Sequence, residues 1–366
     1  MQSHFSWRRR ATLTLLLAST LTLPTVALAA GSAYLVHNLV SDGSVPADHV
    51  DTHLVNPWGV AFGGGPVWVS NNHSGTSTLY NGAGVPQALV VTVPPAPGGD
   101  PVGSPTGIVA SSSNDFVVTK GSKSGPSRFI YCSEDGTISG WSPTADGVNA
   151  IIAVVNPGSN YKGLALATKA DGNFLYAADF VNGKIDMFDK NFAPVASAGG
   201  FSDPTLPSRY APFNIQALDG LLYVAYAKRD KGGQDEQAGK GLGYVNVFDA
   251  DGHLLKHLVA HKNLNAPWGL AIAPAGFGSM AGMLLVGNFG DGTIAAFDAT
   301  TGKSRGKLKG SNGKTLKIDG LWGMAFGNGL SGQDKNTLYF AAGPAGETGG
   351  VYGSVSLVAA EAGVGQ

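Results

Sequence analysis

The chain has 366 residues and carries 24 Lys and Arg against 25 Asp and Glu, so its formal net charge is only −1 at pH 7. Glycine contributes 54 residues while charged residues make up 13% of the chain, a balance typical of many tight turns and few exposed helices. No block of Lys or Arg follows the first ten residues, which argues against a nucleic-acid-binding protein.

The first residues have the pattern of a secretory signal peptide. Arginines at positions 8–10 precede an uncharged apolar run over residues 11–23, and Ala27-Leu28-Ala29 has the small residues of a cleavage site. We therefore predict a cleaved signal peptide over residues 1–29 and one exported domain, periplasmic or extracellular, over residues 30–366. The run is too short to span a membrane, and no second apolar segment of spanning length follows.

From residue 56 onward, one motif centred on glycine recurs six times. The strongest copies are Asn56-Pro57-Trp58-Gly59, Asn265-Ala266-Pro267-Trp268-Gly269 and Leu321-Trp322-Gly323. Weaker copies centre on Gly107, Gly163 and Asn214, the last with Asn in the glycine position. Successive copies lie 48 to 56 residues apart, and a period of about 50 residues indicates a propeller, a solenoid or another repeat array.

The same strand and turn signals follow each copy of the motif. A continuous apolar run, such as residues 284–286, is typical of a strand buried on both faces. Asp-Gly or Asn-Gly then predicts a tight turn, and alternating stretches such as residues 184–188 predict a half-exposed third strand. Adding a fourth, outer strand, such as residues 254–259, gives six four-stranded units. This predicts an all-β fold, a six-bladed β-propeller. The main alternative, a β-sandwich, would not produce six copies of one unit.

Two repeats carry insertions, over residues 111–127 and 228–241. Segments of this length are either binding loops or disordered, and the residues leave both interpretations open. The single cysteine, Cys132, excludes a disulfide within the chain and lies in an apolar run, so we expect a buried core residue.

The two ends of the mature chain are predicted to close the ring. The last repeat runs out at residues 355–358, one strand short of the other five. Residues 34–40 resemble an outer strand, because a similar stretch, residues 255–259, precedes the fifth motif. We therefore expect residues 34–40 to complete the last blade, which would remove two free sheet edges.

These motifs carry a family resemblance. The three strongest copies, together with residues 284–292 and 318–323, resemble a family of exported bacterial β-propellers described as hypothetical proteins of PEP-CTERM genomes. The resemblance covers residues 34–358, and a more distant one extends to NHL-repeat and gluconolactonase/regucalcin-type propellers. It implies the fold but no activity. The lactonase class would add a divalent metal such as calcium at the ring mouth, although its ligand motif has no residue-by-residue match here.

Polar residues of the loops that enter each first strand and leave each second strand should converge at one mouth of the ring. Seven residues are the candidates for a ligand site there: Asn56, His73, Asp179, Asn265, Asn288, Asp291 and Asp319. For each, the alternative is a role in forming a turn or capping a strand.

A second candidate site precedes the first motif. His49, Asp51 and His53 fall within five residues and would suit a metal ion if the loop folds back on itself. The alternative is a solvated loop with unrelated histidines.

We therefore expect an exported, monomeric propeller that binds a small molecule or glycan at its central mouth. Two alternatives stay open: a metal-dependent hydrolase of the lactonase type, and a scaffold that docks other proteins. Whether the protein is an enzyme is not decided by its residues.

Overall fold

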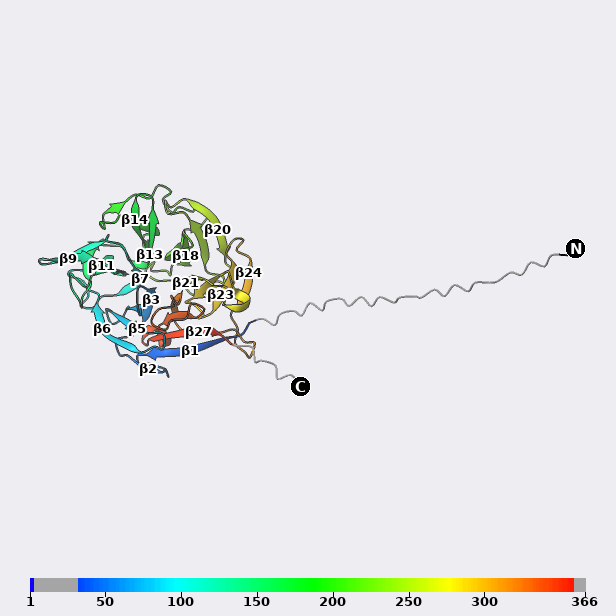
Figure 1. Ribbon diagram of the computed structural model, residues 1–366. Helices are drawn as coiled ribbons and strands as arrows, with labels where there is room; N and C mark the ends of the chain where they lie inside the picture. Colours follow the sequence, from blue (N-terminus) through cyan, green and yellow to red (C-terminus); the bar gives the residue numbers. More distant parts are fainter. Residues whose placement is uncertain (3–31, 359–366) are drawn as a thin grey trace. The chain divides into compact units, whose positions relative to one another are not determined.

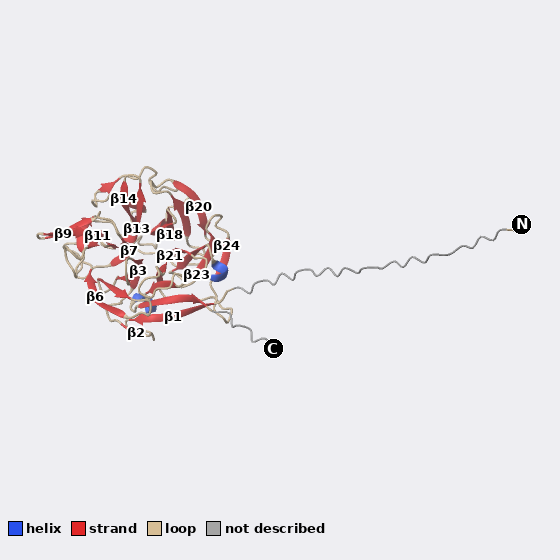
Figure 2. Ribbon diagram, viewed as in Figure 1, coloured by secondary structure: helices blue, strands red, loops and turns tan. Residues whose placement is uncertain are grey.

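A computed structural model describes residues 1–2 and 32–358 of the chain. Residues 32–358 form six main sheets arranged radially around a central axis (Figure 1). Almost all regular structure is strand, apart from the single turn α1 (Pro344–Glu347) and the 3-10 turn η1 (Gly278–Met280) (Figure 2). The predicted six-bladed β-propeller is confirmed. The predicted signal peptide falls almost wholly outside the described residues and stays a prediction. None of the described helical turns is long and apolar enough to cross a membrane.

Each blade has four antiparallel strands, counted from the axis outward, and the first strands contact one another around the ring. Blade 1 contains β3 (Pro57–Phe62), β4 (Val67–Asn71), β5 (Thr76–Tyr80) and β6 (Pro86–Thr92). Blade 2 contains β7 (Pro105–Ala110), β10 (Phe129–Ser133), β11 (Thr137–Trp141) and β12 (Ile151–Val155). Blade 3 contains β13 (Tyr161–Lys169), β14 (Gly172–Asp179), β15 (Lys184–Phe188) and the short β16 (Pro194–Val195).

The second half of the chain repeats this plan. Blade 4 contains β17 (Tyr210–Leu218), β18 (Leu221–Lys228), β19 (Tyr244–Phe248) and β20 (Leu254–Ala260). Blade 5 contains β21 (Pro267–Ile272), β22 (Met283–Asn288), β23 (Ile294–Asp298) and β24 (Ser304–Lys307). Blade 6 contains β25 (Leu321–Phe326), β26 (Leu338–Ala342), β27 (Val351–Leu357) and β1 (Tyr34–Ser41), with β2 (His49–Val50) outside β1.

The ring closes as the sequence predicts. In Figure 1 the first and last strands lie side by side, and β1 pairs antiparallel with β27 from Tyr34 opposite Leu357 to Ser41 opposite Val351. One bulge interrupts the register between Asn38 and Val40. Blade 6 is therefore built from both ends of the described chain, and the pairing gives both strands hydrogen-bonded neighbours in place of free edges.

The repeated glycine marks the place where the first strands approach most closely. A Cβ atom at Gly107 would lie 2.4 Å from the backbone nitrogen of Leu164, and one at Gly323 would lie 2.3 Å from the carbonyl oxygen of Trp58. At the one position without glycine, the Asn214 amide instead donates to the carbonyl of Trp268 at 2.8 Å. The cavity at this level is only about 10 Å³, so the axis is filled and the mouth above it ends blind.

The two insertions lie in different parts of the structure. In blade 2, the hairpin of β8 (Val117–Lys120) and β9 (Lys123–Pro126) packs the buried side chains Phe116 and Val118 into the core around Cys132. In blade 4, the polar loop over residues 228–241 reaches the ring mouth, where Asp235 contacts Lys162 of blade 3. Cys132 is fully buried, as expected, and burial raises the pKa of its thiol to about 12.

Candidate functional site

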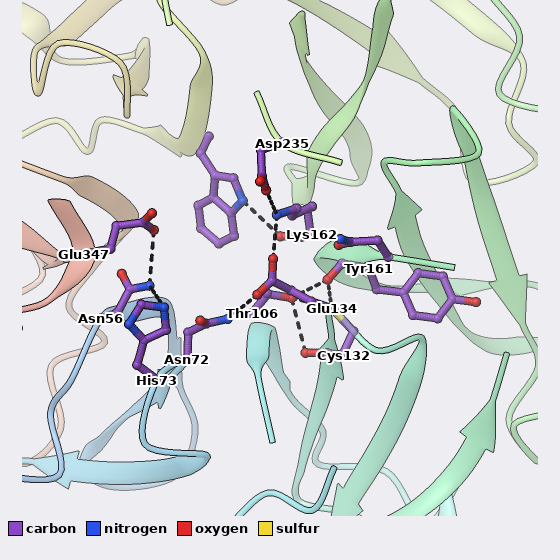
Figure 3. A network of polar contacts seen from close by, with 12 residues as sticks. Asn56, Asn72, His73, Thr106, Cys132, Glu134, Tyr161, Lys162, Asp235 and Glu347 are labelled. Atoms are coloured by element: carbon purple, nitrogen blue, oxygen red, sulfur yellow. Dashed lines mark hydrogen bonds and ion pairs between the residues drawn. The ribbon is translucent and has the colours of Figure 1, made fainter. Parts of the chain in front are cut away.

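A cavity of about 400 Å³ occupies the ring mouth, and we call it the mouth cavity. Five blades contribute its ten lining residues: Asn56, Trp58, Asn72, His73, Glu134, Lys162, Asp235, Glu236, Trp322 and Glu347. Figure 3 shows the polar side chains among them converging from separate blades. Because the axis beneath is closed, a molecule can enter only from the open face.

The floor of the mouth cavity is aromatic. Trp58 and Trp322 stack with ring centres 3.5 Å apart, and Trp268 meets both rings edge-on. Phe180 and Phe213 belong to the same buried cluster. All three tryptophans immediately precede the repeated glycine, so the strand that brings glycine to the axis also sets the indole above it.

Lys162 holds the centre of the site, with a side chain only 2% exposed. Its ammonium lies 2.5 Å from Glu134 Oε1 and 3.1 Å from Asp235 Oδ1 (Figure 3). It also lies 5.3 Å from the centre of the Trp58 ring. Burial alone would lower the pKa of Lys162, but attraction to Glu134, Asp235 and Glu236 outweighs burial and raises it. The side chain is therefore a fixed cation at neutral pH.

The carboxylates around Lys162 have further polar partners. Glu134 Oε2 accepts a hydrogen bond from Asn72 Nδ2 at 3.0 Å. Glu347 Oε1 accepts one at 3.2 Å from Asn56 Nδ2, which also lies 3.3 Å from His73 Nε2. These contacts tie loops of blades 1, 2 and 6 to the same cavity.

Two of the carboxyl groups are hard to ionise. Burial raises the pKa of Glu236 to about 7, against an opposing attraction from Lys162 and with added repulsion from Glu347 and Asp235. Burial also raises the pKa of Glu347, although the hydrogen bond from Asn56 and the charges of His73 and Lys162 act against it. A group that changes charge near neutral pH inside a cavity is typical of a functional site.

Two residues at the cavity have strained backbone conformations. Asn56 has a φ angle of +46° and Glu347 one of +68°, both in the left-handed region that side chains disfavour. Such conformations cost roughly 1 kcal/mol or more each and persist where the surroundings hold them in place. The two strained residues hydrogen-bond each other across the mouth.

Three buried polar atoms at the cavity lack a hydrogen-bond partner among the described residues: Asn56 Oδ1, Trp58 Nε1 and Trp322 Nε1. Trp58 is 3% exposed and Trp322 is 1% exposed. An unsatisfied buried donor costs about 1–3 kcal/mol, so two in the wall of one cavity call for an explanation. A bound molecule or an ordered water that offers acceptor oxygens would supply the partners.

Of the seven predicted ligand residues, Asn56 and His73 line the mouth cavity and the other five do not. Asp179 accepts from the Asn160 N–H and the Asn182 amide, which closes the turn after β14. Asn288 donates to Thr293 Oγ1 and to the Asn263 carbonyl. Both are bonded within their own blades, which is the capping role held open as the alternative.

The remaining three candidates also have local partners. Asn265 Oδ1 accepts from the Gly239 N–H at 2.6 Å and so anchors the blade 4 insertion. Asp291 caps Thr293 and pairs with Lys307 at 3.2 Å. Asp319 accepts from the Ala345 N–H and lines a separate cavity of about 590 Å³ beside the ring closure.

The predicted metal trio does not come together. His53 Nδ1 lies 3.0 Å from Asp51 Oδ1, and the other oxygen of Asp51 accepts from Tyr80 Oη at 3.0 Å. His49 instead lies on β2, in register with Val40 of β1. Throughout residues 32–358, no group of three or more His, Cys, Asp or Glu side chains is placed to hold a metal ion.

Lys162 is the most important site residue that the sequence analysis did not name as a candidate. The repeat pattern could have indicated it. The residue before the repeated glycine is Trp58, Thr106, Lys162, Phe213, Trp268 and Trp322 in the six blades. Lys162 is the single charged member of that set. Asp235, Glu236 and Glu347 lie in segments without a counterpart in other repeats, so no periodic signal points to them.

Comparison with known proteins places the chain in a family. No protein-family model matches it. An uncharacterised protein of Acanthamoeba polyphaga mimivirus is 32% identical over 333 residues, which covers 88% of this chain and 80% of the viral protein. A second protein of that virus is 34% identical over 337 residues, covering 88% and 86%. The chain belongs to the family of these two proteins.

Both relatives are viral and uncharacterised, so they do not bear out the narrower assignment to a bacterial PEP-CTERM family. Among solved structures, a Bacteroides thetaiotaomicron protein of unknown function matches with a TM-score of 0.53, 13% identity, and coverage of 89% of this chain and 76% of that one. A glucose dehydrogenase matches with a TM-score of 0.50, 12% identity, and coverage of 89% and 100%. At these identities the likeness shows the fold alone.

Proposed function

We propose that this propeller binds a small polar molecule or glycan in the mouth cavity. The observation that carries the proposal is the pair of unpartnered indole N–H groups, Trp58 Nε1 and Trp322 Nε1, in the wall of a blind cavity. Around them stand carboxylates, amides and one ammonium, the polar groups that orient a ligand in such sites. The strain at Asn56 and Glu347 supports the same assignment.

A divalent metal fits this cavity poorly. Its central position is taken by the Lys162 ammonium, which already holds Glu134 and Asp235. No three ligand side chains of residues 32–358 converge as a metal ion requires. The proposed function therefore does not involve calcium or another divalent metal.

Hydrolysis is a second candidate function, favoured by one observation. Burial raises the pKa of Glu236 in the mouth cavity to about 7, which suits a carboxyl group that accepts and returns a proton. Glu236→Gln would then abolish turnover of a bound substrate without abolishing binding. Turnover that survives this substitution would argue against the role.

Purification of the mature protein from its native host, followed by structure determination, tests the binding proposal directly. We expect density for a bound molecule within reach of the two indole N–H groups. Asn72→Ala removes a lining amide and should weaken binding of that molecule about tenfold, equivalent to roughly 1.4 kcal/mol. Asn312→Ala, on an exposed loop, should leave binding unchanged. A mouth cavity that holds only water in protein from the host would contradict the proposal.

We also propose that the protein acts after export. The support is the predicted signal peptide over residues 1–29, with cleavage after Ala29. Sequencing the N-terminus of protein recovered from outside the cytoplasm should begin at Ala30. An intact Met1 on cell-associated protein alone would contradict export.

A further inference from the structure

The charges of the mouth cavity are unbalanced. Four carboxyl groups line it, from Glu134, Asp235, Glu236 and Glu347, against the single ammonium of Lys162. Lys162 is already paired with Glu134 and Asp235. Neither Glu236 nor Glu347 forms a salt bridge with any side chain of residues 32–358 within 4 Å of its oxygens, which leaves two carboxyl groups without a cation.

The two unpaired carboxyl groups repel each other, and that repulsion contributes to the raised pKa of Glu236. They come from blades 4 and 6, and the hydrogen bond from Asn56 Nδ2 orients the Glu347 carboxylate. A positive charge between them would relieve the repulsion and favour both ionised forms. An anion would instead add repulsion from the four carboxyl groups that line the cavity.

The floor supplies an independent sign of a ligand. Trp58 and Trp322 are more than nine-tenths buried and line the cavity, and their Nε1 donors have no acceptor among the described residues. A bound molecule with acceptor oxygens would supply the missing partners. The walls therefore suit a positive charge, and the floor suits neutral acceptor oxygens.

We propose that the mouth cavity selects a small organic cation, a primary ammonium compound that also carries hydroxyl or ether oxygens, over neutral and anionic molecules of equal size. The ammonium donates to Glu236 and Glu347, and the oxygens accept from the two indoles. An ammonium fits where a metal ion does not, because its directed N–H groups can be shared by two carboxylates. This inference rests on the proposed binding function and specifies its ligand class.

Three sugars of the same ring size test the selection, because they differ mainly in charge: D-glucosamine, D-glucose and D-glucuronate. Titration calorimetry of the mature protein at low ionic strength should show glucosamine binding at least about tenfold more tightly than glucose, and no measurable binding of glucuronate. A second pair, 1,4-diaminobutane and 1,4-butanediol, separates charge from sugar shape, and the diamine should bind more tightly than the diol.

Matched variants locate the effect. Glu236→Gln and Glu347→Gln each keep the side-chain shape and should each reduce affinity for 1,4-diaminobutane about tenfold. Asp48→Asn removes an exposed carboxylate beside His37, outside the mouth cavity, and should leave affinity unchanged. Thermal unfolding of each variant shows whether a loss of binding reflects a loss of folded protein.

The outcomes separate this inference from the proposed function. Equal affinity for glucosamine and glucose, or preference for glucuronate, would overturn the cation inference and leave binding at the mouth standing. Amine binding that survives both glutamine substitutions would overturn it too, because the cation would lie elsewhere. If none of the five compounds binds, the inference fails. If the structure of protein from the native host then shows a compound without positive charge in the mouth cavity, the proposed binding function stands and only the cation inference is lost.

Discussion

At the residue scale, Lys162 has the largest effect on the charge of the mouth cavity. It occupies a repeat position where three blades place tryptophan, so one residue of the repeat places a charge beside the aromatic floor. An ammonium that is 2% exposed is tolerated only because two carboxylates face it. The same position in the other blades carries no charge.

Replacing Lys162 with Met should destabilise the protein by about 3 kcal/mol at pH 8, because Glu134 loses the cation that compensates its burial. At pH 4 the carboxyl groups can protonate, and the loss should shrink. Urea unfolding at the two pH values measures this difference. Adding Glu134→Gln to Lys162→Met should restore part of the stability at pH 8. A double variant no more stable than the single one would show that the pair is not coupled.

The contribution of Glu236 to the free energy of unfolding should fall as pH rises. Its pKa is about 7 in the folded protein and near the ordinary 4.5 in the unfolded chain, so the folded state holds the extra proton between these values. Stability from this group is therefore fully present below about pH 4.5 and is lost as pH rises through 7. Glu236→Gln should exceed the wild type in stability by an amount on the order of 1 kcal/mol at pH 8 and match it near pH 4. Equal stability curves at all pH values would contradict the raised pKa.

The same residue predicts how binding depends on pH. Glu236 faces Lys162, Glu134, Asp235, Glu347 and His73 around the mouth cavity, and its charge develops as pH rises through about 7. Affinity for 1,4-diaminobutane should therefore increase from pH 6 to pH 8, and Glu236→Gln should flatten that increase. Calorimetry across this range checks both statements, and a wild-type affinity that falls with pH would contradict them.

At the scale of elements, the pairing of β1 with β27 holds the ring shut. His37 and Ser354 stand opposite each other in this pair, at a separation that antiparallel strands make suitable for a disulfide. The double substitution His37→Cys and Ser354→Cys should raise the melting temperature in the oxidised protein, by an amount corresponding to roughly 2–4 kcal/mol. Reduction of the same protein is the internal control. No difference between oxidised and reduced forms would mean that closure does not limit stability.

For the whole molecule, the closed axis makes the mouth a blind cavity, and the glycines make that closure achievable. Gly107→Ala places a Cβ atom 2.4 Å from the Leu164 nitrogen, so the first strands must separate. We expect a loss of about 3 kcal/mol or more in unfolding free energy. Gly64→Ala is the matched control, because nothing lies within 4 Å of its Cβ. Equal stability of the two variants in urea unfolding would contradict the close approach.

The periodic features of the fold were predictable because they depend on local patterns. The motif, with Asn214 in place of glycine in one copy, and the apolar runs recur in all six blades, and Asp-Gly or Asn-Gly turns follow in blades 2, 3 and 5, so these local patterns indicated six blades. The outer-strand pattern of residues 34–40 likewise predicted the closure with β27. Polarity at strand ends was visible too, but the sequence could not separate Asp179 and Asn288, which cap turns, from Asn56, which faces the cavity.

Sequence alone thus determined the repeat, its blade number and its closure, because hydrophobic period and turn chemistry act over a few neighbouring residues. Tertiary structure alone decided the composition of the mouth cavity. Lys162, Asp235 and Glu347 meet there although as many as 185 positions separate them, counting from Lys162 to Glu347. Their meeting depends on how the ring brings blades 3, 4 and 6 to one axis and on how two irregular segments fold over it. No local preference of the chain encodes that geometry.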